Sequence, residues 1–209
     1  MEDYITIWKE KIKHIAGLKA QLLMSPELRD SDIKNFGSIK NTFESAVLIL
    51  LFKKDNEINI LLTKRSSNLK KHSGQISFPG GKKDISDKDL LQTALREAKE
   101  EIGLNSKVTI IGKLTPLLIP ITNFYVHQYV AYCDELPPLS INKDEVESLI
   151  ELPVKELNNS QNIKSKIFGT TTSGREIIAP YYSYNNHEIW GATAMMISEL
   201  YETLFKEEY

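Results

Sequence analysis

Three glutamates at helical spacing are the residues of this chain best suited to chemistry. They are Glu97, Glu100 and Glu101, and they lie in the run of residues 96–104. The apolar residues of the same segment recur at the i, i+3, i+4 spacing of an amphipathic helix, at Leu91, Ala94, Leu95, Ala98 and Ile102. At about 100° per residue, Glu100 and Glu101 lie within about 60° of Glu97, so all three carboxylates share one side of the helix.

Such a group of carboxylates favours binding of a divalent metal ion. Like charges at i, i+3 and i+4 repel by a few tenths of a kcal/mol per pair, and a bound cation would reverse that repulsion. Oxygen-only ligands suit Mg²⁺ or Mn²⁺, and no Cys/His cluster accompanies them, so zinc is not expected. The alternative is an ordinary charged and solvated helix face.

The segment before the helix favours the metal interpretation. Residues 75–78 alternate like a strand, and Pro79, Gly80 and Gly81 form a turn at which the backbone can approach a ligand closely. We predict that the helix spans residues 87–102, with a cap at Ser86 and Asp89 or at Asp87, and that Gly103 ends it. Arg96, four residues before Glu100, is expected to pair with that glutamate.

Basic residues gather just upstream, in a chain whose net charge is only −2. They are Lys64, Arg65, Lys70, Lys71 and the potentially cationic His72, followed by Lys82 and Lys83. A cationic patch beside a metal site would attract a multiply anionic substrate. Arg65 follows the strand-like residues 57–63, so we predict that it contacts phosphate. Lys70 and Lys71 have the alternative of decorating a loop.

Residues 81–104 resemble the Nudix box, which reads Gly, five residues, Glu, seven residues, and then Arg-Glu-apolar-any-Glu-Glu-any-Gly-apolar. Residues 96–104 match it at every fixed position. The first half differs, because Asp87 stands where the box has Glu and eight residues separate it from Arg96. A direct metal role is therefore not expected for Asp87.

Residues 61–81 are similar to the signature of the coenzyme A diphosphatase branch of that family. This signature reads Leu-Leu-Thr-any-Arg-Ser/Thr, then Arg, Gly and Phe-Pro-Gly-Gly, each after three residues. Only Lys70, in place of Arg, departs from it; the charge is kept and the bidentate phosphate fork is lost.

The resemblance implies metal-dependent hydrolysis of coenzyme A or its thioesters to 3′,5′-ADP and 4′-phosphopantetheine or its acyl form. Glu97, Glu100 and Glu101 would be the catalytic residues and would bind Mg²⁺ or Mn²⁺ together with the backbone carbonyl of Gly81. The residues expected to bind substrate are Arg65, Lys70, Lys71, Gly80 and Gly81. Alternative functions are hydrolysis of ADP-ribose or another nucleoside diphosphate derivative, and a non-catalytic nucleotide-sensing module.

The resemblance also points to an acidic residue from a later loop. Glu145 or Glu147 would join the site, unless that loop is simply solvated surface. The tyrosines at 181, 182 and 184 have two interpretations, stacking on adenine or packing in the core.

Composition and pattern set the wider expectations. With 209 residues and 41% hydrophobic content, we expect one α/β domain over residues 41–209 and a helical extension over residues 1–40. The resemblance implies a mixed sheet between helices. The single Cys133 and the lack of a long apolar run indicate a cytoplasmic protein. We expect a small nucleotide substrate of the coenzyme A type and no nucleic-acid or membrane partner. A homodimer is a candidate assembly, and the sequence leaves the oligomeric state open.

Periodicity and turn residues also predict the other elements. A first helix is expected over residues 5–24, and a hairpin joins residues 45–52 and 58–63. Further strands are expected at 108–114 and 124–132, loops at 114–123 and 142–149, a short helix near 155–157, and a final helix from residue 190.

Overall fold

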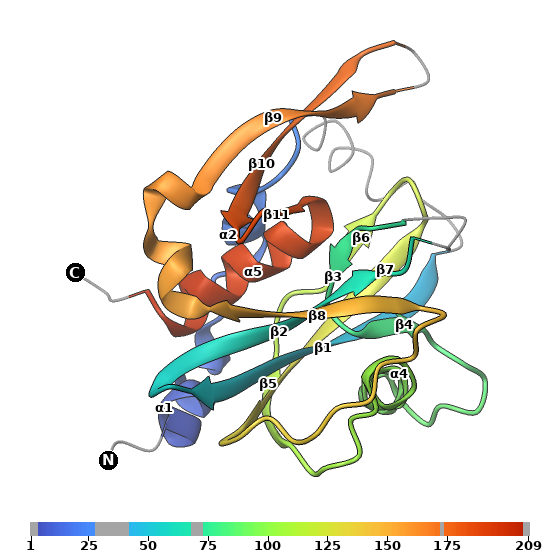
Figure 1. Cartoon of the computed structure of the whole chain (residues 1–209), viewed down its shortest axis with the longest axis vertical. Coiled ribbons are helices and arrows are strands. Elements are labelled where there is room, and N and C mark those ends of the chain that lie inside the picture. The colour runs from blue at the N-terminus through green and yellow to red at the C-terminus, as the bar shows by residue number, and fades with distance from the viewer. Residues whose placement is uncertain (1–3, 28–41, 68–72, 172–173, 207–209) are drawn as a thin grey trace.

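A mixed β-sheet with helices on both faces forms the centre of the molecule (Figure 1). The computed structural model describes residues 4–27, 42–67, 73–171 and 174–206. The eight strands of this sheet are β1 Phe43–Lys54, β2 Glu57–Arg65, β3 Ile76–Ser77, β4 Gly80–Lys82, β5 Thr109–Lys113, β6 Leu117–Ile119, β7 Phe124–Cys133 and β8 Val146–Pro153. The predicted mixed α/β class is confirmed.

A second sheet and the helices complete the architecture. The three strands of the small sheet are β9 Ile163–Thr170, β10 Glu176–Tyr184 and β11 His187–Trp190. The α-helices are α1 Tyr4–Lys11, α2 Gly17–Leu22, α4 Leu90–Ile102 and α5 Gly191–Leu204, and the 3₁₀ helices are η1 Ile12–His14, η3 Val154–Asn158 and η4 Ser160–Asn162. None of the helices within the described ranges is long and apolar enough to cross a membrane.

The hairpin of β1 and β2 is the centre of the large sheet. Its turn residues Asp55 and Asn56 both have positive φ values, 50° and 65°, which match the right-handed twist of the two strands. β1 pairs with β7 in parallel on its other edge, and β2 pairs with β8. The hairpin was predicted from the two apolar runs and the polar turn between them.

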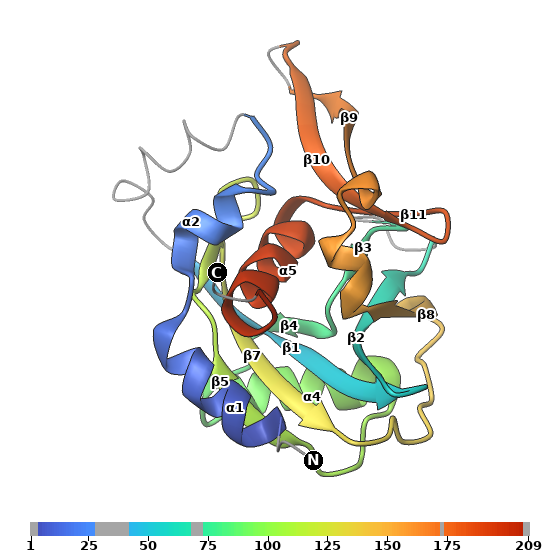
Figure 2. The same cartoon turned by 90° about the vertical axis from the view of Figure 1, so that its left-hand side faces the viewer.

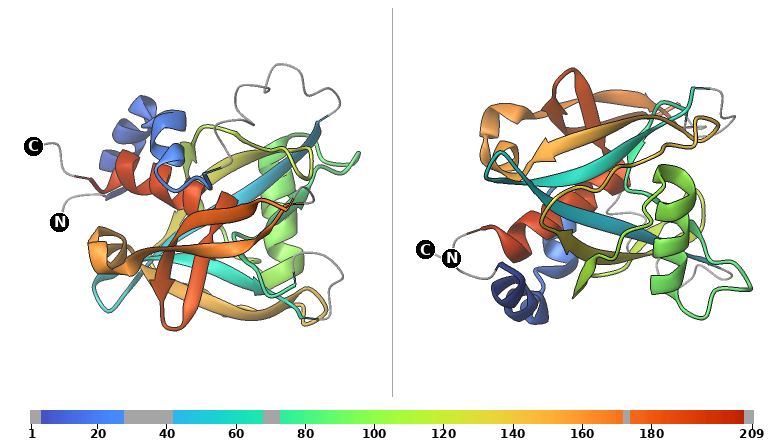
Figure 3. Two further views of the ribbon diagram at one scale, coloured as in Figure 1. Left: turned by 90° about the horizontal axis from the view of Figure 1, so that it is seen from above. Right: turned by 60° about the horizontal axis from the view of Figure 1, so that its bottom comes forward.

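The two faces of the sheet bury separate cores. α4 covers one face, where Ala94, Ala98 and Ile102 pack on Leu48 and Leu50 of β1. The opposite face is covered by α5 and the N-terminal helices, as Figures 2 and 3 show. The alternation of β1 directs successive side chains to opposite faces, which explains why nearly all of its central residues are buried.

The N-terminal helix predicted over residues 5–24 is divided into three pieces. Ile15 has an extended conformation, and Gly17 has a φ of 73°, so the chain changes direction between η1 and α2. Trp8 of α1 is buried and packs edge-on against Tyr132 and Phe205. The described part of the N-terminal segment therefore shares the core of the large sheet.

Three predicted boundaries are wrong. α4 begins at Leu90 rather than 87, because Asp89 is the cap and accepts a hydrogen bond from the Gln92 amide at 2.8 Å. The predicted loop over residues 114–123 contains β6, and the predicted loop over residues 142–149 ends early because β8 begins at Val146. Both strands are stabilised by pairing with distant strands, β6 with β7 and β8 with β2.

Candidate active site

The glycine turn before α4 brings backbone and carboxylate into direct contact. Gly81 pairs with Ala46 of β1, and a Cβ atom added to Gly81 would lie 2.5 Å from the Glu97 Cδ. At Gly80, where φ is 157°, a Cβ would lie 2.4 Å from the Ala46 carbonyl oxygen. A side chain at Gly80 would collide with the β1 backbone, whereas one at Gly81 would force the end of the flexible Glu97 side chain to move. Glycine at position 81 therefore lets the Glu97 carboxylate lie against the β4 backbone.

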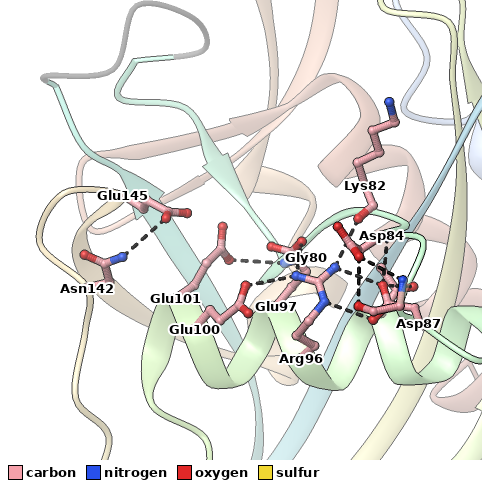
Figure 4. Close-up of polar contacts among 12 residues, drawn as sticks. Gly80, Lys82, Asp84, Asp87, Arg96, Glu97, Glu100, Glu101, Asn142 and Glu145 are labelled. Carbon is pink, nitrogen blue, oxygen red and sulfur yellow. Dashed lines mark hydrogen bonds and ion pairs between the residues drawn. The ribbon is translucent and has the colours of Figure 1, made fainter.

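Glu101 is the most buried of the three glutamates, with an exposed fraction of 3%. Its Oε2 accepts a hydrogen bond from the Gly80 amide at 3.1 Å, and its Oε1 lies 3.6 Å from the Arg65 Nη1 (Figure 4 shows the Gly80 contact). Burial raises the pKa of Glu101 to about 7, although the Gly80 amide and Arg65 both oppose the shift. The sequence-predicted residues Arg65, Gly80 and Glu101 are thus brought together.

Arg96 binds the other two glutamates of the helix. Its Nη1 lies 2.8 Å from Glu97 Oε1 and 2.9 Å from Glu100 Oε2, so the predicted pair with Glu100 is confirmed. The other side of the guanidinium forms a bidentate pair with Asp87, with Nε and Nη2 each 3.0 Å from a carboxylate oxygen. Figure 4 shows Arg96 between Asp87 and the two glutamates.

Asp87 has a positioning role that sequence reasoning missed. Its carboxylate is buried and also accepts hydrogen bonds from the Thr93 hydroxyl and the Asp84 amide, each at 2.9 Å. The hydrogen bonds from Arg96 hold the pKa of Asp87 well below its usual range, despite burial. Asp87 was also a candidate helix cap, but it caps no helix and instead fixes the arginine. Its place as the acidic residue of the box's first half was the available signal.

Glu145 rather than Glu147 lies beside the three helical carboxylates. Its charge contributes to raising the pKa of both Glu97 and Glu101, and its side chain is on the same side of α4 as Glu101 (Figure 4). Asn142 donates to Glu145 Oε1 at 3.3 Å. Glu147 instead pairs with Lys64 at 2.5 Å.

Comparison with known proteins now places the chain in a family. The family model of the NUDIX domain matches residues 42–169, which include β1, α4 and Glu145. The chain belongs to the Nudix hydrolase family.

Its relatives are named as Nudix enzymes. The Uncharacterized Nudix hydrolase NudL of Yersinia pestis (strain Pestoides F) is 36% identical to this chain over 145 residues, which cover 69% of this chain and 71% of the relative. The protein of the same name from Yersinia pseudotuberculosis serotype O:1b (strain IP 31758) has the same identity and coverage. The crystal structure of a MutT/nudix family protein from Enterococcus faecalis has a TM-score of 0.52 at 13% identity, covering 86% of this chain and 71% of that one. That structure agrees in fold.

The carboxylates of this Nudix hydrolase suit a divalent metal ion in chemistry but are not gathered around one point. No three Asp, Glu, His or Cys side chains of the described residues are close enough to form a metal centre. The reason is Arg96, which draws Glu97 and Glu100 toward itself, while Glu101 turns to Gly80. The donors are oxygen only, and burial raises the pKa of Glu97 despite Arg96. A bound cation would stabilise the charged form of this buried carboxylate, so the residues fit the divalent metal ion that such hydrolases use.

The predicted substrate-binding residues are only partly within the described chain. Arg65 is at the end of β2, and its buried Nε has no hydrogen-bond partner among the described residues. Lys70 and Lys71 lie outside the described residues, as does His72. Tyr182 is buried in the core of the large sheet, and Tyr181 packs edge-on against Phe168, which favours packing for these two tyrosines.

Proposed function

We propose that this Nudix hydrolase cleaves the diphosphate bond of coenzyme A or its thioesters, releasing 3′,5′-ADP and 4′-phosphopantetheine or its acyl form. The position of Arg65 carries the proposal. Arg65 belongs to the segment that resembles the coenzyme A diphosphatase signature, and its guanidinium lies 3.6 Å from the Glu101 carboxylate. Its buried Nε has no hydrogen-bond partner within the part of the chain that the structure describes. A phosphate there would complete the arginine's hydrogen bonding beside the catalytic carboxylates.

The remaining roles follow from the site. Glu97, Glu100, Glu101 and the Gly81 carbonyl would hold Mg²⁺ or Mn²⁺, which when bound acidifies a water molecule and neutralises phosphate charge. Glu145 adds a further carboxylate beside these groups. A carboxylate left free of metal would accept the proton of the attacking water. The water oxygen forms a new bond to one phosphorus atom of the diphosphate, and the bond from that phosphorus to the bridging oxygen breaks.

Arg96 and Asp87 position the glutamates and are not expected to contact the substrate. Arg96 holds Glu97 and Glu100 on one side of the helix, and Asp87 fixes Arg96. Because the arginine is tied by two parallel hydrogen bonds to a buried carboxylate, the helix face retains its arrangement without metal. The glutamates need only rotate about their side-chain bonds to reach a cation.

The substrate is tested by a panel with product identification. We expect kcat/KM for coenzyme A to exceed that for dephospho-coenzyme A and ADP-ribose by about tenfold or more, since only coenzyme A carries the 3′-phosphate that a cationic patch would bind. Equal or better turnover of ADP-ribose would favour a nucleoside diphosphate sugar as substrate. Binding of nucleotide that is indifferent to Mg²⁺, with no product formed, would favour a nucleotide-sensing module.

A further inference from the structure

A cavity of about 410 Å³ lies on the other side of β2 from the catalytic glutamates. Its lining includes Lys64 of β2, Gln75, Phe168 of β9, the turn residue Asn186, and Glu188 and Trp190 of β11. It is therefore bounded by the segment leading into β3 on one side and by the small sheet on the other, and β3 and β11 are neighbours in the fold (Figure 1). None of the functional roles above uses this cavity.

Two stacked aromatic rings form one wall of the cavity. Phe168 and Trp190 lie 4.2 Å apart between ring centroids with an interplanar angle of 12°, and Tyr181 meets Phe168 edge-on at 5.6 Å. Tyr181 and Trp190 are direct partners in the β10–β11 ladder, so the strands fix the position of both rings. Phe168 and Trp190 are only half-buried, although the neighbouring Ile189 is fully buried in the core. A rigid, partly exposed stack of this kind is suited to a planar ligand.

The charges around the cavity are balanced. Lys64 pairs with Glu147 at 2.5 Å, and Lys166, whose Nζ lies 4.8 Å from the Phe168 ring centroid, pairs with Glu188. Both lysines thus have a carboxylate partner. A phosphate would have to displace these carboxylates, whereas an uncharged ring would not. The cavity therefore favours an uncharged planar group.

The cavity is directly connected to Arg65. The Gly74 amide donates to the Arg65 carbonyl oxygen at 3.2 Å, and the Arg65 amide donates to the Gln75 carbonyl oxygen at 2.9 Å. Gly74 and Gln75 both line the cavity. Lys64 lines the cavity while Arg65 reaches toward Glu101, as expected for successive residues of a strand. A ligand that passes the end of β2 would present its ring to one side and its phosphates to the other.

We infer that this cavity binds the purine ring of the nucleotide substrate, stacked on the Phe168–Trp190 pair. The inference rests on the proposed function, which places the phosphates at Arg65. The volume lies in the lower part of the range for small-molecule sites, which suits a ring and its sugar rather than a whole coenzyme A molecule. The side-chain amide of Asn186 supplies hydrogen-bonding groups for the edge of the ring.

Calorimetric binding of the two product halves tests this inference, because neither 3′,5′-ADP nor 4′-phosphopantetheine contains a diphosphate bond to cleave. In the full chain with Mg²⁺, we expect Trp190→Ala to weaken 3′,5′-ADP binding about 5- to 100-fold, the usual range for loss of one base–aromatic contact. Its affinity for 4′-phosphopantetheine should stay at the wild-type value. Phe43→Ala is the matched control, since Phe43 is also a half-exposed aromatic with a lysine over its ring, but lies outside the cavity.

Wild-type affinity of Trp190→Ala for 3′,5′-ADP would overturn the inference, as would failure of the unchanged protein to bind this nucleotide. Phe168→Leu, which keeps an apolar side chain, repeats the test if Trp190→Ala does not fold, and unchanged binding in it would also overturn the inference. The proposed function is judged separately by turnover. Weakened 3′,5′-ADP binding in a protein that does not cleave coenzyme A would refute the function and keep the ring site.

Discussion

At the scale of single residues, three glutamates that look alike in the sequence have different surroundings. The Glu100 side chain is 54% exposed, whereas Glu101 is almost wholly buried against Gly80 and Arg65. The shared side of the helix was predictable from spacing alone. The pairing of Asp87 with Arg96 was not, because it depends on how the chain folds between β4 and α4.

The raised pKa of Glu101 predicts a pH-dependent stability for the metal-free protein. The folded protein keeps a proton on Glu101 up to a pKa of about 7, whereas the unfolded chain releases it near the ordinary glutamate pKa of 4.5. This contribution to stability is therefore complete below pH 4.5 and is lost as the pH rises through 7. We expect Glu101→Gln, which carries no such proton, to be the more stable protein at pH 8 by up to about 3 kcal/mol.

Urea unfolding in EDTA at several pH values between 5 and 8 measures this difference. The advantage of Glu101→Gln over the unchanged protein should grow from pH 5 to about pH 7 and level off above it. If the unfolding free energies of the two proteins stay parallel, the burial of a costly carboxylate at this position is refuted.

At the scale of elements, local sequence patterns were sufficient to predict an element wherever its own apolar periodicity and its end residues define it. The β1–β2 hairpin, the end of α4 at Gly103 and the start of α5 after Trp190 were all predictable in this way. β8 was missed because its strand state comes from pairing with β2, more than eighty residues earlier in the chain at Arg65 and Val146. The division of the N-terminal helix depends on how it packs over the sheet.

The β4 turn gives the prediction for this scale. Gly81→Ala displaces the end of the flexible Glu97 side chain from the backbone, so we expect kcat to fall about tenfold or more while the free energy of unfolding changes by less than about 1 kcal/mol. Gly169→Ala is the matched control, because a Cβ there meets no atom within 4 Å and its φ is not in the left-handed region. Steady-state kinetics and thermal unfolding of both variants check this. A Gly81→Ala enzyme as active as Gly169→Ala would show that the close contact has no catalytic role.

At the scale of the whole molecule, one sheet separates two kinds of site. The glutamates proposed to be catalytic lie on the α4 face, while the aromatic cavity lies beyond β2 next to the small sheet, with Arg65 between them. The opposite face also carries the N-terminal helices, and Gln21 of α2 donates to the fully buried Glu199 of α5 at 2.6 Å. The motifs of the sequence predicted the site on the α4 face. The cavity could not be predicted from the sequence, because its lining residues come from four separate segments of the chain.

Turnover of coenzyme A by Glu97→Gln and Glu101→Gln, each at saturating Mg²⁺, is the most direct test of the account. We predict that kcat falls about a hundredfold or more in each, since each variant removes a charged ligand from the site of charge development. Glu151→Gln, which alters only an exposed pair with Lys54, should keep the wild-type rate. Wild-type turnover in either Glu97→Gln or Glu101→Gln would contradict the assignment of metal-assisted hydrolysis to this helix.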